Sequence, residues 1–375
     1  MHTPNLSPSP ASKQLMTELQ SFGLRLADPS AEHAGVASRK GGAGPSDHKA
    51  VVVDGHTIMV PVHTSSAWNS PFVAQAPDAQ GRSALTRGSI PIAQIAFPPA
   101  PRFYGLKTAE GVPYSHIATL HGSDVLATTV LQECIRYASR KKTCQFCAIG
   151  QSLAAGRTIA HKTPAQLAEV AAAAVRLDGV KHMVMTTGTP NATDRGAQVL
   201  CDSAVAIKAA VDLPLQAQCE PPDDDRWFQR MQDAGIDTLG MHLEVVTPAL
   251  RERIMPGKAQ VPISRYMAAF EASVRVFGRG QVSTYILAGL GDSQDAILDI
   301  SAQLLALGVY PFVVPFVPIS GTPLEDHPAP SAEFMQGLLK PLGAMVTQAG
   351  LRSTDIKAGC GKCGACSSLS VFESA

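Results

Sequence analysis

The amino-acid sequence predicts an α/β protein: a partial (β/α)6 TIM-like barrel that follows an N-terminal wrapping segment and precedes a C-terminal cysteine-rich tail. Three observations support this fold class. The 375 residues are 45% hydrophobic and only 17% charged, enough to bury a sizeable core. From Asp124 onward, short β-rich runs alternate with Ala-rich helical windows, which is typical of a parallel sheet. Six such units in roughly 200 residues fit a partial barrel better than an eight-fold barrel, which needs about 250.

The chain before the barrel divides into two segments. Residues 1–45 are rich in Ser, Pro, Gly and Ala and are expected to form a mostly flexible arm, with one amphipathic patch at 15–26 that predicts a short helix. Residues 46–123 are expected to wrap the barrel. Two β-rich runs around Asp54-Gly55 predict a hairpin over 50–62, and the Pro-rich stretch as far as Pro101 indicates irregular structure.

The barrel is expected over residues 124–350 and the cysteine-rich tail over 351–375. The predicted strands are 125–132, 182–187, 213–219, 238–243, 281–287 and 311–316. The predicted helices between them include 165–177, 197–211, 226–234, 266–277 and 295–307. In a barrel of this kind the active site lies at the C-terminal ends of the strands.

Charge and hydropathy limit the partners. The 31 basic and 31 acidic residues cancel, so no electrostatic signal for nucleic acid is present. The most apolar stretch, 309–319, is too short to span a bilayer and contains three prolines, and the N-terminus lacks a signal-peptide pattern. A cytoplasmic location without a membrane partner is expected. Thiols stay reduced there, so the eight cysteines need an explanation other than disulfides.

Cys134, Cys144 and Cys147 follow the first predicted barrel strand. Three thiolates from one loop can hold three irons of a 4Fe-4S cluster and leave the fourth iron open to another ligand. A structural zinc site would want a fourth protein ligand, and a zinc knuckle or a thiol redox pair is the alternative interpretation. The position directly after the first strand of a β/α series favours the cluster.

This loop carries a resemblance to a known family. Cys144-Gln-Phe146-Cys147, with an aromatic residue directly before the last cysteine, resembles the signature of the radical S-adenosylmethionine (SAM) enzymes. The nine residues between Cys134 and Cys144 are a longer spacing than that signature usually has. The resemblance implies that the three cysteines are the catalytic cluster ligands and that Phe146 lies at the cofactor.

Residues 242–265 resemble the fourth-strand region of the group that contains biotin synthase, lipoyl synthase and the hydrogenase H-cluster maturase. In that group a strand-end glutamate and an arginine on the following helix bind the methionine and ribose parts of SAM. The resemblance gives these roles to Glu244 and Arg265. For a lone Glu or Arg, an ordinary surface ion pair is the alternative.

Three further segments match the same group. Residues 284–293 resemble its fifth-strand glycine motif, which implies that Gly289 and Leu290 lie against the adenine, where glycine permits a close backbone approach. Residues 315–323 resemble its sixth-strand exit. The group's second-strand Gly-Gly-Glu motif is replaced by Thr186-Thr187-Gly188-Thr189, which lacks the glutamate. Thr187 and Gly188 are then expected to bind the SAM amino group through hydroxyl and backbone.

Several other polar residues are weighed by position. Gln218, like Gln216, lies on the third predicted strand and is a candidate SAM ligand. Cys219 ends that strand, where core packing and an active-site role are equally expected. Cys201 lies in a helical window and is expected to be an inert buried thiol. His116 and His121 precede the first predicted strand. For both, a histidine with its hydrogen bonds satisfied within the wrapping segment is favoured over a ligand or a substrate contact.

Cys360, Cys363 and Cys366 stand in the glycine-rich tail sequence AGCGKCGACSS. Two spacings of two residues place three sulfurs on one turn, which favours a second 4Fe-4S cluster over structural zinc or free thiols. The fourth ligand stays open between a substrate, a histidine and another cysteine. The tail is expected to fold back over the C-terminal strand ends, with its cluster facing the barrel mouth.

The resemblance implies a radical SAM enzyme that reductively cleaves SAM to a 5′-deoxyadenosyl radical, supplied with electrons by a reductant such as flavodoxin or ferredoxin. The long cysteine spacing and the tail resemble a radical SAM family often encoded beside nitrilase-like enzymes, which suggests a small-molecule substrate linked to nitrile metabolism. The reaction outcome, as an oxidoreductase, lyase or transferase, stays open. An iron-sulfur carrier or assembly protein and an RNA-modifying radical SAM enzyme are the alternatives.

Overall fold

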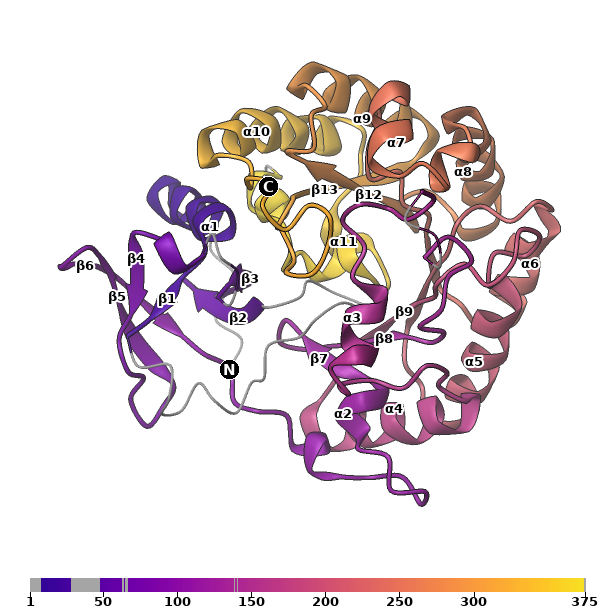
Figure 1. The fold of residues 1–375 in the computed structure, drawn as a ribbon, viewed down its shortest axis with the longest axis horizontal. Helices are drawn as coiled ribbons and strands as arrows, with labels where there is room; N and C mark the ends of the chain where they lie inside the picture. The colour runs from indigo at the N-terminus through magenta and orange to yellow at the C-terminus, as the bar shows by residue number, and fades with distance from the viewer. Residues whose placement is uncertain are drawn as a thin grey trace.

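The computed structural model describes residues 8–27, 48–62, 64, 67–137, 139 and 141–373. Figure 1 shows two parts, an N-terminal lobe that carries helix α1 and strands β1 to β6 and a larger α/β part in which helices surround a curved sheet. The two hydrophobic clusters with the most buried residues follow this division, one inside the α/β part and one inside the lobe. We call the larger part the barrel.

The barrel sheet has seven strands in the order β13-β12-β11-β10-β9-β8-β7, in which β8 to β13 are parallel and β7 is antiparallel to β8. All six predicted strands are present. The additional strand β7 has three residues, too few for a sequence pattern. The strands are β7 Thr119–His121, β8 Val125–Thr129, β9 His182–Thr186, β10 Leu215–Gln218, β11 Thr238–Gly240, β12 Val282–Ala288 and β13 Val309–Pro315.

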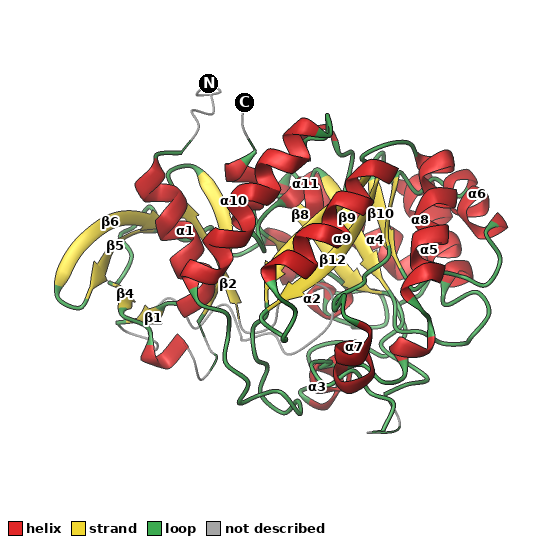
Figure 2. Ribbon diagram, turned by 90° about the horizontal axis from the view of Figure 1, so that it is seen from above, coloured by secondary structure: helices red, strands yellow, loops and turns green. Residues whose placement is uncertain are grey.

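Helices cover the outside of this sheet, as Figures 1 and 2 show. Helix α4 illustrates how local sequence sets their bounds: Thr163 and Gln166 form a capping box, Pro164 begins the helix, and Gly179 ends it in the left-handed region with φ 66°. The larger helices are α4 Pro164–Asp178, α5 Ala197–Ala210, α6 Arg226–Asp233, α8 Ile263–Phe277, α9 Gln294–Leu307 and α10 Ala332–Gln348. The shorter ones are α2 Tyr114–Ile117, α3 Ile149–Ala154 and α7 Pro248–Ile254. Among the described residues, no helix is long and apolar enough to cross a membrane.

The N-terminal lobe is a six-stranded sheet in the order β1-β4-β5-β6-β2-β3. The predicted hairpin is present, with Asp54 and Gly55 at φ 47° and 78° in its two-residue turn. The expectation of irregular structure as far as Pro101 is wrong, because three short strands pair there. Their faces are partly buried, and the prolines around them obscure the strand pattern in the sequence. The strands are β1 Arg25–Leu26, β2 His48–Val53, β3 His56–Pro61, β4 Phe72–Ala74, β5 Arg82–Arg87 and β6 Ile90–Ala96.

Only part of the predicted arm over 1–45 can be compared with the structure. Helix α1, Pro10–Phe22, lies over most of the amphipathic patch and buries Met16 and Leu19 completely. Residues 1–7 and 28–47 lie outside the described residues. The four-part division of the chain at residues 45, 123 and 350 stays a prediction.

The tail contacts the starts of the barrel strands. The Thr238 hydroxyl donates to the Ala358 carbonyl at 3.0 Å, and the Cys360 amide donates to Gln216 Oε1 at 3.2 Å. On its other side the Ala365 carbonyl accepts from the Met59 amide of the lobe at 2.7 Å. The tail contains a short helix, α11, at Cys360–Cys363 and lies inside the curve of the sheet in Figure 1.

The expectation that the tail faces the C-terminal mouth is therefore wrong. Helix α10 runs back along the sheet after β13, as helices in β/α units do, and it delivers the chain to the end where the strands begin. The tail sits at that end, between the barrel and the lobe.

Candidate functional site

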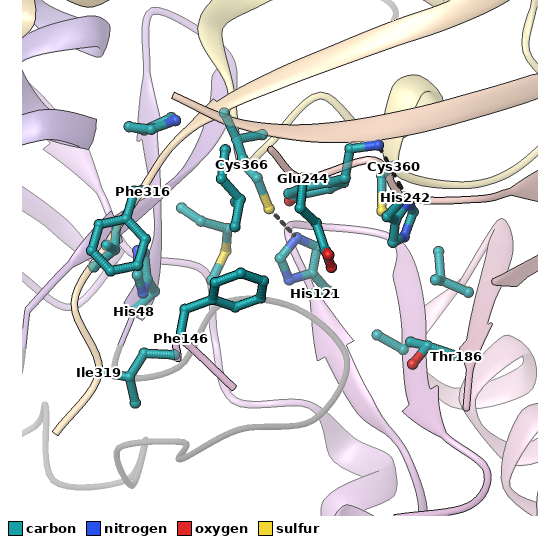
Figure 3. Close-up of a pocket in the computed structure, with 18 of the residues that line it drawn as sticks. His48, His121, Phe146, Thr186, His242, Glu244, Phe316, Ile319, Cys360 and Cys366 are labelled. Atoms are coloured by element: carbon teal, nitrogen blue, oxygen red, sulfur yellow. Dashed lines mark hydrogen bonds between the residues drawn. The ribbon is translucent and has the colours of Figure 1, made fainter. Parts of the chain in front are cut away.

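Two cavities border the inner face of the barrel sheet and share part of their walls. Gln20, His48 and Met59 of the lobe also line one of them. The first, of about 300 Å³, is lined by Cys134, Cys144 and Cys147, and we call it the cysteine-loop cavity. The second, of about 290 Å³, is lined by Cys360 and Cys366 of the tail, and we call it the central cavity (Figure 3). The shared lining residues are Phe146, Thr186, Gln218, His242, Glu244 and Ile319. The two sets of cysteines therefore border one connected interior.

The cysteine loop follows β8 and is held by short local bonds. The Cys147 amide donates to the Cys144 carbonyl at 2.9 Å, and the Gln145 amide donates to the Ile254 carbonyl at 2.7 Å. Gly188, at the end of β9, lets the loop approach, because a Cβ there would overlap the Glu133 carbonyl. Thr187 and Gly188, both predicted as cofactor contacts, line the cysteine-loop cavity, as does Phe146.

The thiols of this loop are poorly placed to ionise alone. Burial raises the pKa of Cys147 to about 12 and that of Cys144 well above its usual range. A thiol in such surroundings becomes a thiolate ligand only when a metal compensates its charge. In the part of the chain that the structure describes, no three His, Cys, Asp or Glu side chains converge around a point closely enough to hold a single metal ion.

Glu244 stands where β11 leads into the next loop, and its backbone adopts φ 62°, unusual for a residue with a side chain. Its amide donates to the Tyr285 carbonyl and its carbonyl accepts from the Leu287 amide, both at 2.8 Å. Its Oε2 pairs with Lys258 Nζ at 2.7 Å. Burial alone would lower the pKa of Lys258, but Glu244 raises it, so the Lys258 ammonium group stays charged. Both line the cysteine-loop cavity, and such backbone outliers cluster at functional sites.

Two buried charged residues hold the Glu244 loop. Arg251, 2% exposed, donates through Nη1 to the carbonyls of Leu243 at 2.7 Å and Val245 at 2.9 Å. The Asp292 carboxylate accepts from the amides of Val246 and Thr247, both at 2.9 Å. The glycine motif of 284–293 therefore supports the loop that carries Glu244.

The predicted adenine contacts lie beside this support. Gly289 has φ 106°, and its carbonyl contacts His327 Nε2 at 2.8 Å. Leu290 is buried in a small apolar cluster to which Phe146 packs. Neither residue lines the two cavities described above.

Arg265 is likewise outside both cavities. Its Nη2 donates to Asp225 Oδ1 at 2.7 Å and also to the Pro222 carbonyl. The structure thus brings Glu244 to the cysteine loop but leaves Arg265 holding the segment that follows β10.

Glu220 is a site residue that sequence reasoning did not assign. It is 8% exposed, its Oε1 accepts from Thr189 Oγ1 at 2.7 Å and from Arg136, and its Oε2 has no hydrogen-bond partner among the described residues. Arg195 Nη1 lies 3.6 Å from that oxygen. Burial alone would raise the pKa of Glu220, but Lys258 and Arg136 lower it below the usual value, so the group is a carboxylate. Its position after Cys219, at a strand end, was the available signal.

Gln218, predicted as a SAM contact, lines both cavities but binds toward the tail. Its Nε2 donates to Gln216 Oε1 at 2.7 Å and to Cys360 Sγ at 3.2 Å. His242, missed in the sequence, also lines both cavities, and its Nδ1 accepts from the Tyr285 amide at 3.2 Å. Burial, aided by Lys258, lowers the pKa of His242 to about 3, so its ring is neutral.

The tail thiols form the second cysteine group. Cys366 Sγ lies 3.2 Å from His121 Nε2, the pair joined by a dashed line in Figure 3. Tyr285 also hydrogen-bonds Cys366. Burial raises the pKa of Cys360 to about 11 and that of Cys363 to about 12.

The remaining candidates separate clearly. Cys201 lies in helix α5, buried and away from both cavities, whereas Cys219 is buried in the wall of the cysteine-loop cavity. His116 is on the short helix α2 and lines neither cavity. All eight cysteines are free of disulfides.

Comparisons with known proteins agree with this geometry. The radical SAM superfamily model matches residues 140–304. A bacteriochlorophyllide c C-7(1)-hydroxylase from Chlorobaculum limnaeum is 32% identical over 126 residues, 33% of this chain and 31% of the relative. A probable dual-specificity RNA methyltransferase RlmN from Moorella thermoacetica is 26% identical over 125 residues, 33% of this chain and 35% of the relative. The chain thus spans about a third of the length of these curated relatives.

Solved structures were also compared. A methylornithine synthase covers 72% of this chain and 77% of its own, with a TM-score of 0.47 and 15% identity. The FeFe-hydrogenase maturase HydG from Carboxydothermus hydrogenoformans covers 60% of this chain and 52% of its own, with a TM-score of 0.42 and 17% identity. The family match spans Cys144, Cys147 and Glu244, which border the cysteine-loop cavity. Residues 140–304 of this chain form a radical SAM superfamily domain.

Proposed function

We propose that the protein is a radical SAM enzyme acting on a small molecule, with a 4Fe-4S cluster held by Cys134, Cys144 and Cys147. The observation that carries the proposal is that three thiols of one loop line a single cavity together with polar groups suited to an amino acid. The residues fit the cofactor, because the cavity also holds a buried carboxylate oxygen, Glu220 Oε2, that has no hydrogen-bond partner among the described side chains. When bound, the cluster and SAM supply one-electron cleavage of SAM and a 5′-deoxyadenosyl radical.

The polar residues of the cavity would orient SAM. Lys258 places an ammonium group against the cavity, which suits the carboxylate of the methionine part. Glu220, whose Oε2 accepts no hydrogen bond from the described residues, suits an amino group, and it would stand in for the glutamate that the second-strand motif lacks. Thr187 and Gly188 border the same space, and Glu244 sets the position of Lys258. Arg265, assigned to SAM by resemblance, would act by holding the chain after Glu220.

The substrate would occupy the central cavity, which begins at Phe146 and Glu244 and ends at the tail. Its volume of about 290 Å³ is at the small end of the range for ligand sites, about 300 to 1,000 Å³. Its walls are mostly apolar. The polar side chains that line it together with Glu244 are Gln20, His48, His121, Thr186, Gln218, Tyr285 and a neutral His242. This supports a small, weakly charged metabolite, such as one linked to nitrile metabolism, over an RNA chain.

We also propose that Cys360, Cys363 and Cys366 hold a second 4Fe-4S cluster. The support is their spacing of two residues, which matches the ligand run of iron-sulfur proteins, and the position of Cys360 and Cys366 in the lining of the central cavity. Zinc is the rival metal. Reductants such as flavodoxin or ferredoxin, and a reducing cytoplasm, would suit both sites.

The test is anaerobic reconstitution followed by iron counting, EPR with and without SAM, and detection of 5′-deoxyadenosine. A radical SAM enzyme shows a SAM-dependent change in the EPR of its reduced cluster and forms 5′-deoxyadenosine. An iron-sulfur carrier would hold iron and show neither, and that result would overturn the proposal. SAM cleavage is then measured in the presence of RNA and in the presence of small nitriles and amides. The compounds that stimulate cleavage identify the substrate class.

A further inference from the structure

We infer that His121 is the fourth protein ligand of the tail cluster, so that the site is Cys360, Cys363, Cys366 and His121. The inference rests on the second cluster of the proposed function and deepens it. Its first support is direct: His121 Nε2 and Cys366 Sγ face each other at 3.2 Å in Figure 3. Imidazole nitrogen is an accepted replacement for thiolate on iron-sulfur clusters.

The fold delivers His121 to the tail for reasons of topology. His121 ends the antiparallel strand β7, opposite Val125 at the start of β8, and is 7% exposed. The turn that follows contains Gly122, and a Cβ built there would lie 3.5 Å from Cys363 Sγ. Two tail sulfurs therefore border the His121-Gly122 corner. Strand β7 forms the edge of the sheet beside β8, and its last residue contacts the tail.

Glycines shape the tail backbone on either side of Cys360 and Cys363. Gly359 has φ 106°, and a Cβ there would overlap the Gln216 side chain, so only glycine lets the chain reach the barrel interior. Gly364, with φ 67°, ends the turn of α11 and redirects the chain toward Cys366. Cys360 is fixed by Gln218 Nε2 at 3.2 Å. Simple core packing would not need three thiols, each separated from the next by two residues, beside one imidazole.

Four protein ligands would distinguish this cluster from the first. The cysteine loop offers three thiols and leaves an iron for SAM, whereas the tail set leaves no iron open. Cys360 and Cys366 nevertheless line the central cavity. The substrate would then lie against the tail cluster without ligating it, between that cluster and the cysteine loop.

The experiment isolates the tail cluster by replacing Cys134, Cys144 and Cys147 together with alanine in the full chain. We expect about four irons to remain, those of one cubane, and pulsed EPR of the reduced cluster to show a strong nitrogen coupling from imidazole. His121→Ala added to this protein removes that coupling. His121→Cys removes it while keeping the iron. The matched control is His182→Gln, which is expected to keep the coupling. His182 accepts a hydrogen bond from the Gly359 amide of the tail at 3.2 Å and contacts no tail sulfur in the hydrogen bonds of the described residues.

If the triple variant does not fold, the same His121→Cys and His182→Gln substitutions are compared in the otherwise unchanged protein carrying both clusters. A coupling that survives His121→Ala or His121→Cys, or a tail that retains zinc after anaerobic purification, overturns the inference. A failure of the proposed function would give a different result. The EPR signal of the cysteine-loop cluster would then not change on addition of SAM, whether or not the tail cluster shows the nitrogen coupling.

Discussion

The barrel carries two groups of three half-buried thiols, and the residues around the two groups differ in charge. At the C-terminal strand ends, the cysteine loop shares its cavity with the Glu220 carboxylate and with the ion pair of Lys258 and Glu244. Around the tail, the groups that contact the sulfurs are the neutral Gln218 and Tyr285 and the imidazole of His121. The charged end suits a zwitterionic cofactor such as an amino acid, and the neutral end suits a metal group completed by the protein.

The largest expected effect comes from the cysteine loop. Replacing any one of Cys134, Cys144 and Cys147 by alanine abolishes 5′-deoxyadenosine formation, measured by chromatography, because each thiol is proposed to hold one iron. Circular dichroism stays close to wild type, since these side chains border a cavity rather than fill the core. Full SAM cleavage by Cys134→Ala would show that another residue is the third ligand.

A pair of glycine substitutions separates the two ends. Gly188→Ala pushes the cysteine loop away from β9, and Gly359→Ala pushes the tail away from Gln216, because each added Cβ would overlap its neighbour. Each variant is expected to lose about half of the roughly eight irons that two four-iron clusters hold. Iron counting and SAM-dependent EPR identify the end that is affected. Equal effects on both ends would show that the two sites do not assemble independently.

Glu244 and Arg265 should differ, although the resemblance gives them equal roles. Glu244→Ala leaves Lys258 buried without its partner and weakens SAM binding roughly ten-fold or more, the cost of one hydrogen bond to a charged group, about 1.5 to 3 kcal/mol. Arg265→Ala has a smaller effect, because Arg265 binds outside the cavity. SAM titration of the reconstituted protein measures both. A larger loss of SAM affinity for Arg265→Ala than for Glu244→Ala would show that Arg265 belongs to the SAM site.

Glu220→Gln keeps the shape of the side chain and removes its charge. If Glu220 binds the SAM amino group, affinity for SAM falls about ten-fold while the tail cluster is unchanged. The surface variant Asp224→Asn is the control, because Asp224 lies on the same segment, pairs with the exposed Arg226 and lines neither cavity. Unchanged SAM titrations for Glu220→Gln would discard the assignment.

His242, which borders both cavities, gives the smallest effect, a pH dependence of stability. Its pKa is lowered from 6.5 to about 3, mainly by burial, so the unfolded chain binds a proton between these values that the folded protein does not. Stability therefore falls as pH decreases below 6.5, by at most about 1.4 kcal/mol per pH unit from this group. Thermal unfolding of wild type and His242→Asn at pH 7 and pH 5 measures it. An equal decrease in both proteins would remove His242 as the source.

Sequence reasoning determined the elements of the barrel and the cysteine loop. Six strands and five helices lie close to their predicted positions, because each depends on a local pattern of buried apolar residues and on caps such as Thr163 and Gly179. Cys134, Cys144 and Cys147 border one cavity because they leave one strand on one loop. These properties need only short-range information, which a single sequence contains.

Only the tertiary structure decided which residues meet. Glu220, Lys258 and His242 come from different strand ends and loops, and His121 meets Cys366 across 245 residues of chain. The placement of the tail at the strand starts follows from the direction of helix α10, and Arg265 is turned away by its bond to Asp225. Such contacts depend on the relative direction of whole elements, which packing of the complete core sets and which no local pattern of residues encodes.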